Sequence, residues 1–291
     1  MSLSSAPALA LAAAICFSLA GVILGRALAL INPLTTACVS VTVTAIITWV
    51  VASTTDDLSL LFTPAVVPFL VAGFIAPGLS RLILFIGYSR IGVGRTMTLM
   101  SVTPLFAIVM AILFLGERPS LLLLVGAGLI VGGVIVMARR ARDDTSWRRR
   151  HMIFPLVAAL MFAMRDTVSR AALVHFPHPL IGAAAATMMA VVAIWSFAGV
   201  QKGMGRLAFN GPGTRLALLS GLWEGTAYIL MWRALGRGHV SVVTPLVNST
   251  PLFTVVLVMI FLRGVERMTW RITVASVMAV AGVFLVVLGR S

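Results

Sequence analysis

Long apolar runs separated by short connections limit most strongly what this sequence can fold into. A helix needs about 20 mostly apolar residues to cross a bilayer. Ten runs meet that length, at residues 8–30, 34–53, 65–88, 95–115, 120–138, 152–174, 179–200, 214–235, 240–262 and 269–289. The connections contain turn-forming segments such as INP, GERPS and FNGPG. The predicted fold class is therefore an all-α integral membrane protein with ten transmembrane helices.

The composition supports a lipid environment and argues against nucleic acid as a partner. Only 10% of the residues are charged, whereas a soluble domain of this length is about a quarter charged. The formal net charge of +14 comes from arginines and lysines gathered in the connections, and such clusters fix the orientation of membrane proteins. We expect the lipid bilayer and a small molecule as partners, and no nucleic acid.

The chain repeats itself. The segment that starts at Val102, VTPLFAIVMAILFLGERPS, is echoed from Ser249 by STPLFTVVLVMIFLRGVERMT. The matched positions are Pro104-Leu105-Phe106 with Pro251-Leu252-Phe253, Glu117-Arg118 with Glu266-Arg267, and Gly133 with Gly282. We divide the chain into a first five-helix repeat at 1–140, a basic connecting loop at 141–151 and a second repeat at 152–291. Because five is odd, the second repeat must cross the membrane in the opposite sense, a plan typical of secondary transporters with substrate near the midplane.

The segment LFLGERPS closes a fourth helix, a glycine-rich fifth helix follows, and both features are repeated in a chain of ten predicted helices. In these features the sequence resembles the EamA branch of the drug/metabolite transporter superfamily. The resemblance implies a basket of ten helices around a central cavity. It also implies transport of amino acids, sugar phosphates, nucleotide sugars, drugs or other metabolites, so the cargo stays open. We expect no catalytic residues, metal or cofactor, because all four histidines, His151, His175, His178 and His239, fall at span ends or in loops. The expected location is the bacterial inner membrane, with the protein as a monomer or homodimer.

The two ends of the predicted helices differ in charge. Lysine and arginine favour one side by about three to one, with the loop ARRARDDTSWRRR as the largest contributor. The positive-inside rule makes that side cytoplasmic and places both termini outside. The resemblance implies the opposite, because ten-helix members of the family have both termini inside. We favour the charge distribution.

Glu224 is the most unusual residue within a predicted span. It lies at the middle of the eighth run, where its short side chain reaches neither membrane surface. A carboxylate at that depth must be protonated, paired or facing water. Glu224 is therefore a candidate for substrate binding and proton coupling, and the alternative is a structural ion pair with an arginine.

Arg165 and Asp166 lie just past the middle of the sixth run. Neighbouring residues of a helix point about 100 degrees apart, so we expect one of them to enter the cavity while the other packs against a neighbouring helix. Both are candidate substrate-binding residues.

Arg81 lies about 7 Å along the axis beyond the middle of the third run, at 1.5 Å per residue, and a long side chain can cover that distance to the headgroups. Pro77 stands one turn earlier, predicts a kink and frees the carbonyl of Gly73. The third and eighth helices are repeat-mates, so Arg81 and Glu224 are expected on opposite sides of one cavity. Arg81 is thus either a snorkelling anchor or a substrate-binding residue.

One positive and one negative group in a cavity suit a zwitterion, because arginine binds a carboxylate with two parallel hydrogen bonds and glutamate accepts an ammonium. The same two groups could instead neutralise each other when no cargo is bound. Asn248, between Pro245 and Pro251, is predicted to line the cavity. Tyr228 and Trp223 could form its wall, with lipid-facing bulk as the alternative for Trp223.

The sequence predicts a secondary transporter for an amino acid or similar zwitterion that works by alternating access, with proton coupling as an option. A flippase for a lipid-linked amino sugar is the alternative within transport, and a structural or sensory membrane protein is the alternative from another class. Trp232 is assigned to an interfacial aromatic belt. The glycine pairs Gly21/Gly25 and Gly221/Gly225 have the small-xxx-small spacing that predicts close helix contacts.

Overall fold

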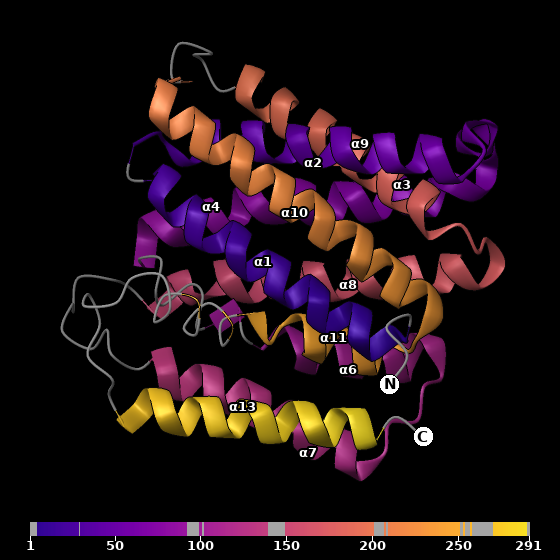
Figure 1. The fold of residues 1–291 in the computed structure, drawn as a ribbon, viewed down its shortest axis with the longest axis vertical. Coiled ribbons are helices and arrows are strands. Elements are labelled where there is room, and N and C mark those ends of the chain that lie inside the picture. The colour runs from indigo at the N-terminus through magenta and orange to yellow at the C-terminus, as the bar shows by residue number, and fades with distance from the viewer. Residues whose placement is uncertain are drawn as a thin grey trace.

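The computed structural model describes residues 5–28, 30–91, 99–100, 102–138, 149–200, 207, 209–250, 253, 257 and 270–289. Within this part of the chain all regular structure is helical (Figure 1). Each of the ten predicted ranges contains helix where it is described. The prediction of an all-α fold is confirmed.

The first half contains α1 (Ala6–Leu28) and α2 (Pro33–Thr55), followed by a bent segment and two further helices. The bent segment consists of the short helices η1 (Leu58–Phe62) and η2 (Pro64–Val66), then α3 (Val67–Gly73), η3 (Phe74–Leu79) and α4 (Ser80–Ile91). The further helices are α6 (Thr103–Leu115) and α7 (Leu121–Ala138). Local signals set several ends: the Asn32 side chain accepts the Thr35 N–H at 2.8 Å where α2 begins, and Gly116, with φ 66°, ends α6.

The second half begins with η4 (Arg149–Met152) and α8 (Ile153–His175), followed by α9 (Pro179–Val200). It continues with α10 (Gly211–Arg237), α11 (Val240–Val247) and α13 (Trp270–Leu288).

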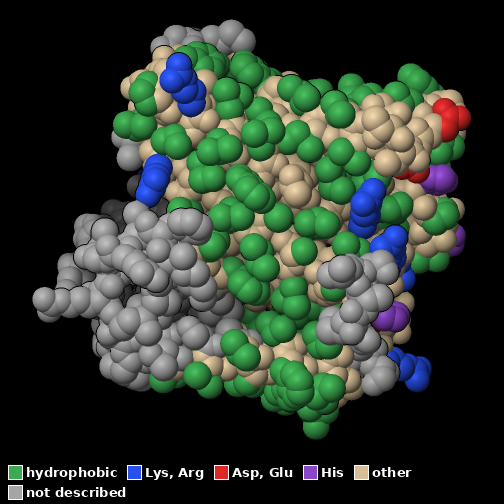
Figure 2. Space-filling view, in the orientation of Figure 1, with side chains coloured by type: hydrophobic (Ala, Val, Ile, Leu, Met, Phe, Trp, Pro, Cys, Tyr) green, Lys and Arg blue, Asp and Glu red, His purple; other side chains and the backbone are tan. Residues whose placement is uncertain are grey.

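The helices have the length and apolar surface of membrane spans. Five segments of the described chain are long and apolar enough to cross a bilayer: Ala6–Leu28, Pro33–Thr55, Pro64–Leu84, Arg150–His175 and Pro179–Val200. Two shorter apolar helices lie at Thr103–Leu115 and Leu121–Gly133. A helix of 23 residues, such as α1, is about 35 Å long, enough for the hydrocarbon core of about 30 Å. Figure 2 shows a mostly apolar face in which charged side chains gather at the two ends of the helices.

The helix contacts of the two halves correspond when the halves are exchanged. α1 packs on α10, and its counterpart α8 packs on α3 and α4, which together correspond to α10. α2 also packs on α10, and its counterpart α9 packs on α3 and η3. In the same way α1 packs on α11, and α8 packs on α6. Three contacts join equivalent helices directly: α2 with α9, α6 with α11, and α7 with α13. The α2–α9 and α7–α13 pairs lie at opposite edges of the molecule (Figure 1).

Glycines allow several of these helices to approach closely. A Cβ atom on Gly126 of α7 would lie 2.7 Å from the carbonyl oxygen of Gly282 in α13, and one on Gly221 would lie 2.7 Å from the Val43 side chain of α2. The predicted close contact at Gly221/Gly225 is therefore confirmed. The same prediction for Gly21/Gly25 is wrong, because a Cβ there would meet no atom of the described chain within 4 Å. The spacing marks a narrow helix face, but the partner helix decides whether that face is used.

Candidate functional site

The third predicted helix is broken inside the membrane region, as Pro77 predicts. Within η3, Ala76 has extended backbone angles (φ −149°, ψ 128°). Gly78 follows two residues later, and a Cβ there would lie 3.0 Å from the Gly73 carbonyl oxygen. A new helix, α4, then begins at Ser80. The break therefore places Arg81 in the first turn of a helix that starts in the interior of the protein.

Arg81 forms an ion pair with Glu224. Its Nη2 atom contacts the Glu224 Oε1 atom, and its Nη1 atom donates to the Ser40 hydroxyl at 3.0 Å. The side chains of Arg81 and Glu224 are 17% and 9% exposed. The pair joins α4 to α10, and Ser40 adds α2. Arg81 is thus bound by two neighbouring helices.

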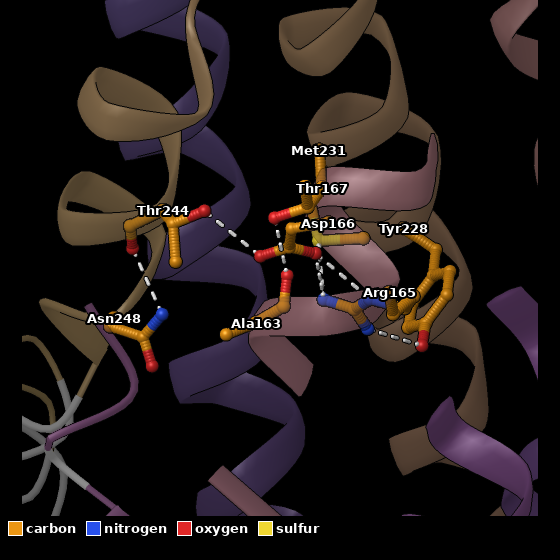
Figure 3. Close-up of polar contacts among 8 residues, drawn as sticks. All are labelled: Ala163, Arg165, Asp166, Thr167, Tyr228, Met231, Thr244 and Asn248. Atoms are coloured by element: carbon orange, nitrogen blue, oxygen red, sulfur yellow. Dashed lines mark hydrogen bonds and ion pairs between the residues drawn. The ribbon is translucent and has the colours of Figure 1, made fainter. Parts of the chain in front are cut away.

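A second charged cluster surrounds Arg165 and Asp166 (Figure 3). The Nε and Nη2 atoms of Arg165 donate to Oδ1 of Asp166 at 2.9 and 2.6 Å. The Nη1 atom of Arg165 donates to the Tyr228 hydroxyl at 3.0 Å, and the Thr244 hydroxyl donates to Oδ2 of Asp166 at 2.9 Å. The cluster joins α8, α10 and α11, and both charged side chains are buried.

The structure places Arg165 and Asp166 in contact with each other, which the sequence did not predict, and that one of them lines a cavity stays a prediction. Their partners on other helices do differ, Tyr228 for Arg165 and Thr244 for Asp166, as the angle between neighbouring positions requires. However, the arginine side chain is long enough to bend back and contact the adjacent carboxylate. The guanidinium also lies 5.1 Å from the centre of the Phe162 ring, in cation–π geometry. The two residues form a neutral pair within one helix.

The aromatic candidates occupy three different environments. Tyr228 is buried, and its ring meets Phe17 edge-on at 5.9 Å. Trp223 is 37% exposed, which fits the lipid-facing alternative. Trp232 is fully buried and packs edge-on against Phe69 at 5.7 Å, so its assignment to an interfacial belt is wrong.

Asn248 ends α11. Its side-chain Nδ2 atom donates to the Thr244 carbonyl at 2.9 Å, and its backbone N–H donates to the same oxygen at 2.9 Å. Pro245 lies within this helix and has no N–H of its own. The side chain therefore stabilises the end of a short helix, and a role in lining the cavity stays a prediction.

The two charged clusters are neighbours along α10. Glu224 and Tyr228 are four residues apart on one helix face, so their Cα atoms are about 6 Å apart along the axis. Each cluster contains one arginine and one carboxylate. The centre of the protein therefore has two adjacent, internally neutral ion pairs, one between helices of different halves and one within α8.

Two polar partners of these clusters, Ser40 and Thr244, and one buried carboxylate outside them, Glu117, were not predicted from the sequence. Ser40 and Thr244 are small hydroxyl residues within apolar runs, and such residues usually bond to their own helix. Glu117 was noticed as a family motif, yet it is buried and accepts hydrogen bonds from the start of α11. The signal for Glu117 was its recurrence as Glu266 in the second half.

Comparison with known protein families identifies the family of this chain. The profile of the EamA-like transporter family matches residues 4–139 and again residues 149–288. The chain belongs to the EamA-like transporter family. The resemblance seen in the sequence is thereby confirmed: this is an integral, multi-pass membrane transporter of the drug/metabolite transporter superfamily.

Solved structures share the fold of this EamA-like transporter. One, titled "Crystal structure of protein", superimposes with a TM-score of 0.84, covers 98% of this chain and 97% of its own, and is 15% identical. At that identity the likeness concerns the fold alone. A search of curated proteins finds no match.

Proposed function

We propose that this EamA-like protein is a secondary transporter for a small zwitterion, an amino acid or a close analogue, in the bacterial cytoplasmic membrane. The observation that supports the proposal is the Arg81–Glu224 ion pair, which joins α4 of the first half to α10 of the second. One guanidinium and one carboxylate are the two groups that recognise an α-carboxylate and an α-ammonium.

The energetics of the pair favour a ligand with both charges. Removing one partner from a buried ion pair leaves an uncompensated charge, which costs about 3–5 kcal/mol. A monovalent anion or cation would satisfy one of Arg81 and Glu224 and leave the other without a partner. A zwitterion replaces both partners at once, so the pair can open while the charge of the site stays balanced.

The proposed mechanism is alternating access between two inverted five-helix repeats that form ten spans. The matching contacts of the two halves support this arrangement, because exchange of equivalent helices converts one set of contacts into the other. Secondary transporters of this plan hold substrate near the midplane between the repeats. The Arg81–Glu224 pair lies between repeat-mate helices, where such a site is expected.

The remaining candidate residues form a supporting layer in this proposal. Tyr228 lines the site one turn from Glu224, and its hydroxyl is held by Arg165. Asp166 and Thr244 fix the position of Arg165 in turn. In this arrangement the second ion pair orients the wall of the site, and the first ion pair exchanges partners with the substrate.

A panel of matched ligands tests the proposed cargo class. L-Leucine has both charged groups, isoamylamine lacks the carboxylate, and 4-methylpentanoate lacks the ammonium. We expect L-leucine, or another zwitterion of a wider amino-acid panel, to raise the unfolding temperature of the detergent-purified protein. We expect the two singly charged analogues of that zwitterion to have little effect. Equal stabilisation by a singly charged analogue would contradict the proposal.

Uptake into liposomes then separates the two modes of transport. If Arg81 and Glu224 simply exchange partners with a zwitterion, uptake responds neither to a pH gradient nor to a valinomycin-imposed potential. If Glu224 also carries a proton, an imposed pH gradient drives uptake and the Glu224→Gln variant loses that response. A variant that transports normally and keeps its pH response would exclude proton coupling by Glu224.

A further inference from the structure

Glu117 has a role that its place in a surface turn does not suggest. It follows α6 in the connection to α7, yet it is only 8% exposed. Its Oε1 atom accepts the Val240 N–H at 2.9 Å, and its Oε2 atom accepts the Ser241 N–H at 3.0 Å. Both donors belong to the first turn of α11, where N–H groups have no partner within the helix. A carboxylate of the first half therefore caps a helix of the second half.

Helix α11 is buried among other helices at one end of the molecule. Seven consecutive residues, from Val240 to Leu246, are buried, and the helix packs against α1, α6, α8 and α10. We call this end the termini end, because Figure 1 shows both marked chain ends there. A Cβ on Gly238, just before α11, would lie 2.6 Å from the Cβ of Ala6 in the first turn of α1, in agreement with this placement.

The Arg165–Asp166 cluster lies beside α11 and is nearer to the termini end than the Arg81–Glu224 pair. α10 runs toward that end and finishes there at Arg237, so Tyr228 is one turn closer to it than Glu224. The hydroxyl of Thr244, one turn into α11, donates to Asp166 at 2.9 Å. Two carboxylates thus hold α11 on the side of the Arg81–Glu224 pair that is nearer to the termini end.

We propose that Glu117 is a positioning residue for transport: its two hydrogen bonds hold α11 as a closed gate at the termini end, and substrate passage at that end requires them to break. The inference rests on the proposed transport function. The proposal assigns a role to the glutamate of the GER turn. Glu117 lies outside α11, so breaking its hydrogen bonds can release the helix as a whole. Charge-assisted hydrogen bonds are stronger than neutral ones, so this cap contributes more than an ordinary turn contact.

Two variants weaken the cap from opposite sides. In Glu117→Gln, one acceptor oxygen becomes an NH₂ group that faces a backbone donor. In Val240→Pro, the carboxylate stays and one N–H is lost. Proline is favoured at the first position of a helix, and His239 before it already has the extended conformation that a following proline requires (φ −73°, ψ 144°). The matched control Val240→Ala shortens the side chain and keeps the N–H.

Labelling of a buried thiol reports the state of the gate. In a background without native thiols (Cys16→Ala, Cys38→Ala), a cysteine replaces Val243, which is 1% exposed on α11. Liposomes are treated with a membrane-impermeant maleimide, and a Ser59→Cys protein marks the vesicle face at the termini end, because Ser59 is exposed in the connection after α2. This assay needs no substrate.

We expect Glu117→Gln to raise the labelling rate of the Val243→Cys thiol from the termini end by about tenfold, which corresponds to about 1.4 kcal/mol in the opening equilibrium. Val240→Pro, which keeps one of the two hydrogen bonds, should give a smaller rise, and Val240→Ala should label like the parent. Equal labelling of the parent and Val240→Pro would overturn the proposal, as would a Val240→Ala rate that matches Val240→Pro.

The asymmetric variant keeps the test decisive if Glu117→Gln does not fold, because Val240→Pro leaves Glu117 intact. Failure of the gate and failure of the proposed cargo are separable. A zwitterion that stabilises the protein while Val240→Pro leaves labelling unchanged removes the gate alone. Faster labelling in Val240→Pro, together with no response to any zwitterion, keeps the gate and removes the cargo.

Discussion

A double-mutant cycle on Arg81 and Glu224 tests whether their ion pair is an energetic unit. Arg81→Met keeps a long unbranched side chain without charge, and Glu224→Gln keeps the shape of the carboxylate. Both native side chains are less than one-fifth exposed, so solvent screens the pair only slightly. Each single change leaves one charge without its partner, which costs about 3–5 kcal/mol in a buried pair.

The structure lets the two single variants be ranked. In Glu224→Gln, Arg81 keeps its bond to the Ser40 hydroxyl and is the more exposed partner, at 17% against 9%. Within the range of about 3–5 kcal/mol, we therefore expect Glu224→Gln to lower the free energy of unfolding by an amount near the lower end and Arg81→Met by an amount near the upper end. The double variant removes both charges, so it should be less destabilised than Arg81→Met alone, with a coupling energy of about 2 kcal/mol or more.

Reversible unfolding in mixed micelles of SDS and dodecylmaltoside measures these differences. Arg118→Met is the control, because Arg118 is an exposed arginine in a connection and its loss should change the free energy of unfolding by less than about 0.5 kcal/mol. If the cost of the double variant equals the sum of the two single costs, the ion pair does not act as a unit. A zwitterion would then gain no energetic advantage over a singly charged ligand by replacing both partners.

Three further substitutions test helix packing and one hydrogen bond of the Arg165 cluster. Gly73→Ala should destabilise the protein by more than about 2 kcal/mol, because its Cβ would lie 2.0 Å from the Ala186 carbonyl oxygen of α9. Gly21→Ala should be neutral or stabilising by up to about 1 kcal/mol, because its Cβ would meet nothing within 4 Å in the described chain. Equal thermal shifts for the two variants would show that this close helix contact does not limit stability. Tyr228→Phe removes the acceptor of one Arg165 hydrogen bond and should cost about 1–3 kcal/mol in the same unfolding assay, whereas a variant as stable as the parent would show that this bond adds nothing.

The fold was predictable because hydrophobic run length and proline position act locally. The apolar runs mark where the described helices lie, and Pro77 marks the break before α4. The repeat also assigned Arg81 and Glu224 to equivalent helices on opposite sides of one cavity, with mutual neutralisation as one alternative, and in the structure the two side chains are paired. In each case, information a few residues long or a symmetry of the chain was sufficient to place these elements.

The contacts that the sequence did not predict depend on how each helix is rotated about its axis and how closely it approaches its neighbours. Whether Gly21 faces a neighbour, and whether Trp232 is buried, depends on helices distant in sequence. The bond between Arg165 and Asp166 depends on the rotamer of a flexible side chain, which periodicity does not specify. Glu117 was hardest to place, because a charged residue in a turn is usually solvated, and only the position of α11 shows why this one is buried.

The two ion pairs differ in a way that assigns them separate tasks. Arg165 and Asp166 belong to one helix and move together, so motion between the halves cannot separate them. Arg81 and Glu224 belong to different halves, so any relative motion of α4 and α10 strains their contact. Opening a buried pair is costly unless other charges replace the partners. In a transporter whose halves move against each other, the pair between the halves is therefore the one that a substrate can relieve, and the pair within α8 is the one that can keep the wall of the site in place while this happens.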